Sequence, residues 1–171
     1  MDLIAIYVED HLALSLGGIR LARRALRENE GKPLGVLLAS IIPELEEDRE
    51  TLARTLRALG GTPSRVKETA VAAGELLGRL KPNGRLLGYS PLSRVWELEA
   101  LVAGSDSRRG AFTALARAQR DDSRLAGYSY EALAVRAAVH RDAFERERIR
   151  AAEIAFARPD ERVAGRPIKA V

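Results

Sequence analysis

Apolar side chains recur at the spacing of an α-helix along most of the chain, and this regularity limits the fold more than any other feature. Leu, Ile and Val residues three or four positions apart form one broad apolar face between residues 3 and 27 and a second between residues 34 and 59. The strict alternation of apolar and polar residues that indicates β-strands is nearly absent. The sequence therefore predicts an all-α protein.

Glycine, proline and asparagine mark the ends of the predicted helices. The stretch 28–33 contains Asn29, Gly31 and Pro33, which favour the end of one helix and the start of the next. Because this connection is short, the helices on either side of it should form an antiparallel hairpin. The main helices are expected near residues 3–28, 34–59, 64–80 and 129–158, with shorter accessory helices near 91–103 and 108–120.

Two interruptions and a tail complete the predicted organisation. Pro43 lies inside the second predicted helix and removes one backbone hydrogen bond, so we expect a kink there. Gly104-Ser105-Asp106 should separate the two accessory helices. Residues 1–158 are expected to form one helical domain, followed by a flexible basic tail at residues 159–171.

The composition excludes several kinds of chemistry. The chain has no Cys, which removes disulfides, thiolate nucleophiles, zinc sites with Cys ligands and Cys-bound iron–sulfur clusters. It also lacks a Gly-rich phosphate-binding loop after a strand, and it lacks the Gly-x-Ser-x-Gly turn of α/β-hydrolases. With only two His residues, any metal site must depend on carboxylates.

The charge pattern bears on partners and location. The chain carries 28 basic and 24 acidic residues, and they alternate along the helices, as in Glu46-Glu47-Asp48-Arg49-Glu50. This pattern is typical of solvated helix faces, so we expect no nucleic-acid partner, and a nucleic-acid-coating stress protein is the least favoured alternative. The N-terminus lacks the pattern of a signal peptide, and no apolar run approaches the ~20 residues that span a bilayer. The sequence predicts a cytoplasmic protein without a membrane partner.

Four polar residues lie on or beside the apolar faces of the predicted helices: His11, Glu44, Asp48 and His140. Burial of an ionisable group is costly unless the group is paired. Since His11 and Asp48 are about equally far from the turn of the first hairpin, we expect a hydrogen bond between them that satisfies both. A second interpretation adds Glu44 and His140 and makes a metal site of carboxylates and imidazoles. A third is a solvated cleft or a ligand pocket.

The first hairpin resembles the paired helices of the ferritin-like superfamily, with Glu9-Asp10-His11 on one helix and Glu44 to Arg49 on the other. Residues 46–67 look like part of its stress-inducible bacterial branch, and residues 78–94 look like ferritin-like proteins of high-GC bacteria. The resemblance covers residues 3–158. It implies an antiparallel ferritin-like four-helix bundle with two shorter accessory helices, which assembles into a homodimer or a larger homo-oligomer.

The di-iron centre of that superfamily uses one Glu from each of two helices and a Glu-x-x-His pair from each of the other two. Here Glu44-x-x-Glu47 lacks the His, and Ala137 replaces the Glu that would precede His140. The resemblance therefore implies a degraded motif. The leading interpretation is a self-associating, non-enzymatic bundle with a vestigial buried His/carboxylate site and no cofactor.

The alternative interpretation is an oxidase or a metal-storage protein with a reduced site. Such a site would hold Fe or Mn, because imidazole and carboxylate ligands suit these ions. Its ligands would be His11, Glu44, Asp48 and His140.

Overall fold

The computed structural model describes residues 2–63 and 89–157, and every regular element within them is helical. The long helices are α1 (Leu3–Glu28), α2 (Pro33–Ala58), α4 (Pro91–Ala118) and α5 (Tyr130–Phe156). A 3-10 helix, η1 (Ser123–Leu125), lies in the connection between α4 and α5. The prediction of an all-α protein is confirmed.

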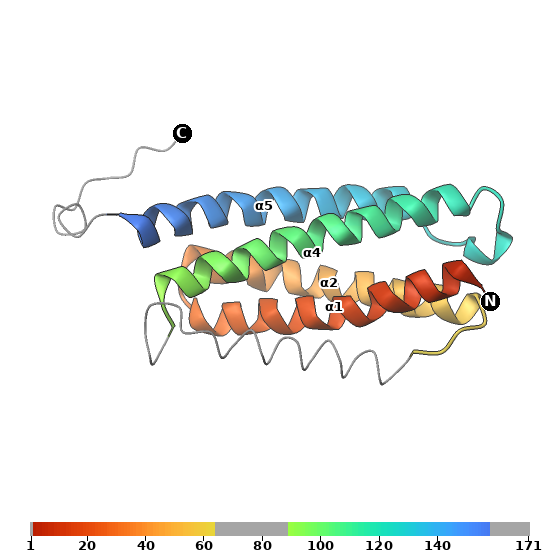
Figure 1. Ribbon diagram of the computed structural model, residues 1–171, viewed down its shortest axis with the longest axis horizontal. Helices are drawn as coiled ribbons and strands as arrows, with labels where there is room; N and C mark the ends of the chain where they lie inside the picture. Colours follow the sequence, from red (N-terminus) through yellow and green to blue (C-terminus); the bar gives the residue numbers. More distant parts are fainter. Residues whose placement is uncertain (1, 64–88, 158–171) are drawn as a thin grey trace.

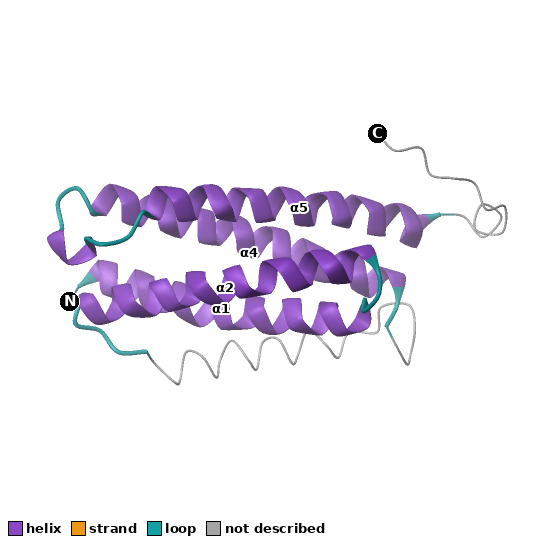
Figure 2. Ribbon diagram, turned by 180° about the vertical axis from the view of Figure 1, so that it is seen from behind, coloured by secondary structure: helices purple, strands orange, loops and turns teal. Residues whose placement is uncertain are grey.

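The four helices lie side by side along the long axis of the molecule (Figure 1). Helices α1 and α2 run in opposite directions and are joined by a short turn, and α4 and α5 form a second antiparallel pair. The most extensive contacts are those within the two pairs, and α1 also packs against α4. The view from behind shows the same arrangement (Figure 2).

Local sequence signals define the helix ends. Asp2 caps α1, because its Oδ1 accepts hydrogen bonds from the backbone N–H groups of Ile4 (3.0 Å) and Ala5 (3.3 Å). Ser90 caps α4 by accepting from the N–H of Ser93 at 3.0 Å. Gly31 in the first turn has a φ of 72°, which favours glycine. The predicted ends of the first two helices therefore agree with the structure to within one residue.

The expected break at Gly104-Ser105-Asp106 is wrong, because α4 runs without interruption from Pro91 to Ala118. Ser105 is buried on the same face as Leu101 and Phe112, and the packing of this face outweighs the cost of about 1 kcal/mol for a glycine inside a helix. Helix α2 likewise continues through Pro43, which lies on its exposed side. The predicted helix at 64–80 and the predicted tail at 159–171 lie outside the described residues.

The apolar core has two parts, one toward each end of the four helices. The first includes Ile19, Leu38, Leu45, Leu98, Leu101 and Phe144. The second includes Val8, Leu12, Leu52, Leu56, Phe112, Leu115 and Tyr130. The two parts are separated on α2 by the turn that carries Asp48, which is fully buried. Over the described ranges, no helix is both long enough and apolar enough to cross a membrane.

Candidate functional site

Asp48 is the centre of a polar network between the two parts of the core. Its side chain is only 1% exposed. The Oδ2 atom lies 3.0 Å from Nε of Arg108 on α4, and Oδ1 accepts a hydrogen bond from Nη2 of Arg136 on α5. One buried carboxylate is therefore paired with two guanidinium groups from two different helices.

His140 joins this network through both ring nitrogens. Its Nδ1 lies 2.8 Å from Nη2 of Arg108, and its Nε2 lies 2.8 Å from Oε2 of Glu44. Because a guanidinium group can only donate, Nδ1 must accept, and the ring proton is on Nε2, which donates to Glu44. The geometry thus selects one neutral tautomer of His140.

The network extends to solvent along α2. Glu47 accepts a hydrogen bond from Nη1 of Arg136 at 2.9 Å, and its side chain is 68% exposed. Glu44 is 43% exposed, whereas His140 is 4% exposed. We call the whole set the central network: Glu44, Glu47, Asp48, Arg108, Arg136 and His140.

Burial and pairing act in opposite directions on the charges of the central network. Burial raises the pKa of Asp48, and Arg136 and Arg108 oppose this rise. Burial lowers the pKa of Arg108, with Asp48 acting against it. Burial also lowers the pKa of His140, and Arg108 adds to the fall while the hydrogen bond to Glu44 opposes it. His140 is therefore neutral at neutral pH.

The structure does not form the expected pair between His11 and Asp48. His11 is half-buried, and its ring lies edge-on to that of Tyr7 with the ring centroids 4.5 Å apart. Asp48 is instead reached by Arg108 and Arg136, which come from α4 and α5. The prediction considered only the first hairpin, and so it missed the partners that the second hairpin provides.

Three of the four proposed metal ligands, Glu44, Asp48 and His140, belong to the central network, while His11 lies outside it. Residues 2–63 and 89–157 contain no group of three or more His, Asp or Glu side chains arranged to hold a metal ion. Both oxygens of Asp48 face guanidinium groups, whose positive charge opposes a cation at that position. The donor set fits a hydrogen-bonded ion network better than a metal ion.

The helical spacing of the sequence also places Arg108 and Arg136 on buried stripes. Arg136 precedes His140 by one helical turn, on the same stripe of α5. Arg108 precedes Phe112 by one turn and follows Leu101 by two. The expected break before residue 108 concealed this second stripe.

A second buried carboxylate, Glu97 on α4, is also paired. Its Oε1 lies 2.7 Å from Nη2 of Arg24 on α1, and its Oε2 accepts a hydrogen bond from the Tyr89 hydroxyl at 2.7 Å. Asn29 donates to the same hydroxyl at 3.2 Å. Burial raises the pKa of Glu97 and raises that of Tyr89 to about 12. These contacts fasten the end of α1 to the start of α4.

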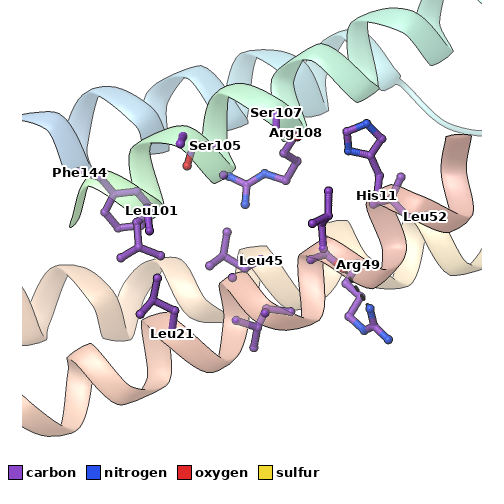
Figure 3. A pocket seen from close by; sticks show the side chains of 18 residues that line it. His11, Leu21, Leu45, Arg49, Leu52, Leu101, Ser105, Ser107, Arg108 and Phe144 are labelled. Atoms are coloured by element: carbon purple, nitrogen blue, oxygen red, sulfur yellow. Dashed lines mark hydrogen bonds between the residues drawn. The ribbon is translucent and has the colours of Figure 1, made fainter. Parts of the chain in front are cut away.

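A cavity of about 430 Å³ lies between α1 and α4, next to the central network. Its ionisable lining residues are His11, Arg49 and Arg108, with no Asp or Glu among the described residues that line it. Figure 3 shows the Arg108 guanidinium extending from α4 toward the middle of the cavity, with Leu101 and Phe144 toward the other end. The volume is within the range of small-molecule sites, about 300–1,000 Å³.

Comparison with known proteins identifies no relative of this chain. No family model matches the chain, and neither a curated protein nor a solved structure does.

Proposed function

We propose that this protein is a non-enzymatic, self-associating helical bundle of ferritin-like architecture, in which the central network ties the helices together where a metal centre would otherwise lie. One observation carries the proposal: the buried carboxylate of Asp48 is paired with both Arg108 and Arg136. The two guanidinium groups provide the positive charge that a metal ion would provide to buried carboxylates. The residual His and carboxylate groups are then structural.

Metal analysis of the whole protein tests this proposal. The protein is purified without chelator, incubated with Fe(II) or Mn(II), desalted and measured by inductively coupled plasma mass spectrometry. We expect less than stoichiometric metal in the parent and no change in a Glu44→Ala/His140→Ala variant. Glu46→Ala is the matched control, because Glu46 is exposed on the same helix and pairs with Arg23 instead.

The competing function is an oxidase or a metal-storage protein that holds Fe or Mn on His11, Glu44, Asp48 and His140. The observation in its favour is the 2.8 Å contact between His140 Nε2 and Glu44 Oε2, which brings two metal-binding groups together. Stoichiometric metal that is lost in Glu44→Ala/His140→Ala and kept in Glu46→Ala would establish this function and refute a purely structural network.

Self-association is supported by exposed apolar side chains on α5. Val135 and Val139 are one turn apart and are 65% and 60% exposed, and Phe156 is 68% exposed. Apolar side chains repeated along one helix are typical of surfaces that a partner covers. We expect sedimentation velocity to show a dimer or larger species that Val139→Lys converts to monomer, while Val36→Lys on α2 does not. A monomeric parent at micromolar concentration would refute this part of the proposal.

A further inference from the structure

The cavity between α1 and α4 has a buried floor and an open mouth. Leu45, Leu52 and Leu101 are among its buried lining residues, whereas Leu14 and Gly104 are exposed. A small molecule entering past the exposed residues would therefore reach an apolar interior.

Small residues make room for the cavity. Its lining includes Gly17 and Gly18 on α1 and Ala103 and Gly104 on α4. A Cβ atom built on Gly18 or on Gly104 would meet no atom within 4 Å. Glycine inside a helix costs stability relative to alanine, and nothing in the described surroundings excludes a larger side chain at these positions. The packing of the described residues therefore does not account for the glycines at 18 and 104 or for the open space beside them.

The lining is divided into a basic part and an apolar part. His11 lies toward one end, the Arg108 guanidinium extends to the middle, and Leu21, Leu101 and Phe144 lie toward the other end (Figure 3). Arg49 also lines the cavity, but its guanidinium donates to Ser15 Oγ at 3.0 Å and to the Leu12 carbonyl. An occupant would therefore meet basic side chains from the middle of the cavity to one end, which we call the basic end, and hydrocarbon at the other end.

Arg108 brings a largely buried positive charge to the lining of the cavity, while carboxylates of the central network act on the same group. Its described partners are Asp48, at 3.0 Å from Nε, and the neutral ring of His140, at 2.8 Å from Nη2. Asp48 also pairs with Arg136, which pairs with Glu47 as well, and Glu44 adds a further negative charge that acts on Arg108. The Arg108 side chain is 13% exposed, so an anion in the cavity would interact with it at low effective dielectric.

We propose that this cavity binds a small amphipathic carboxylate, with its anionic group beside Arg108 and His11 and its hydrocarbon chain along Leu21, Leu101 and Phe144. This inference goes beyond the structural function proposed above, since it assigns a ligand site. A cation would be repelled by the basic end, and a neutral apolar molecule would leave that end without a partner. The apolar end also excludes a small, fully hydrated anion.

Titration calorimetry on the full chain with octanoate, decanoate and octanol tests the site. We expect both carboxylates to bind at one site per chain, and octanol, which matches octanoate in length but has no charge, to bind about tenfold more weakly, as the loss of one charge-assisted contact predicts. Failure of both carboxylates to bind at millimolar concentration would overturn the proposal. Equal affinity for octanoate and octanol would overturn the assigned role of the basic end.

Filling the cavity provides a test that leaves the central network intact. Gly18→Leu places a side chain in the open space, and we expect it to reduce octanoate affinity at least tenfold without lowering the thermal unfolding midpoint. Gly110→Leu is the matched control, because Gly110 is an exposed helical glycine that does not line the cavity, and a Cβ atom built on it would also meet no atom within 4 Å. Binding unchanged in Gly18→Leu, or lost equally in Gly110→Leu, would refute the location.

Arg108→Gln tests the charge directly. We expect about tenfold weaker binding of octanoate and unchanged binding of octanol, so that the preference for the carboxylate disappears. A variant that keeps the parent's preference would show that Arg108 does not recognise the anionic group. Since Arg108 also pairs with Asp48, the circular dichroism spectrum of the variant is first compared with that of the parent. If the variant has lost its helices, the binding measurement on Gly18→Leu tests the proposed site instead.

Discussion

Replacing Asp48 with Asn tests most directly how the central network contributes to stability. The substitution keeps the size of the side chain and removes its charge. Arg108, which is 13% exposed, then loses the carboxylate that pairs with it and keeps only the weaker electrostatic effect of Glu44, while Arg136 keeps Glu47 at 2.9 Å. The variant therefore leaves one largely buried cation without a paired carboxylate.

The expected loss follows from this imbalance. Removal of one partner of a buried ion pair costs about 3–5 kcal/mol, because the remaining charge stays desolvated. Most proteins have a free energy of unfolding of about 5–15 kcal/mol, so this is a large fraction of the total. With an m-value of about 2–3 kcal/mol/M, the urea midpoint should fall by roughly 1–2.5 M.

Urea denaturation followed by far-ultraviolet circular dichroism measures this loss. Glu47→Gln is the matched control, because Glu47 pairs with the same Arg136 but is 68% exposed, and an exposed pair contributes at most about 1 kcal/mol. An Asp48→Leu/Arg108→Leu double variant removes both charges and should recover much of the lost stability. An Asp48→Asn midpoint as close to the parent as that of Glu47→Gln would show that Asp48 carries no buried charge.

Three further perturbations have defined outcomes. The pKa of His140 is lowered in the folded protein, so the unfolded chain binds a proton more readily than the folded chain does. The free energy of unfolding should therefore fall as the pH drops below about 6.5. Denaturation of the parent and of His140→Gln at several pH values should show a flatter pH dependence in the variant. Gly110→Ala should raise the unfolding free energy by about 0.5–1 kcal/mol, and a lower thermal midpoint would contradict the open space around it. Tyr130→Phe removes the 2.8 Å contact with the Thr55 hydroxyl and should cost about 1 kcal/mol in urea titrations, whereas an unchanged midpoint would mean that water replaces the bond.

Local signals in the sequence were sufficient for most of the helices and for the burial of two site residues. Asn29, Gly31 and Pro33 located the first turn, and the apolar stripes of α2 and α5 placed Asp48 and His140 in the interior. Such signals depend on one helix at a time. For this reason they predicted which residues are buried better than which residues are in contact.

The partners of Asp48 required the packing of helices that are distant in sequence. Arg108 is 60 positions from Asp48 and Arg136 is 88 positions away, so neither pair follows from helical spacing. A glycine at 104 is also a reasonable sign of a helix end, and only the burial of Ser105 and Phe112 shows why the helix continues. The errors arise where tertiary packing overrides local preference.

The central network also sets the axial alignment of the helices. Leucine-rich faces tolerate sliding, because one aliphatic layer packs nearly as well as the next. A shift of α4 or α5 by one turn, about 5.4 Å, would carry Arg108 or Arg136 away from Asp48 and set a charge against leucine. The ion pairs midway along the helices therefore favour one axial register for each helix, as a single buried polar residue does in a coiled coil.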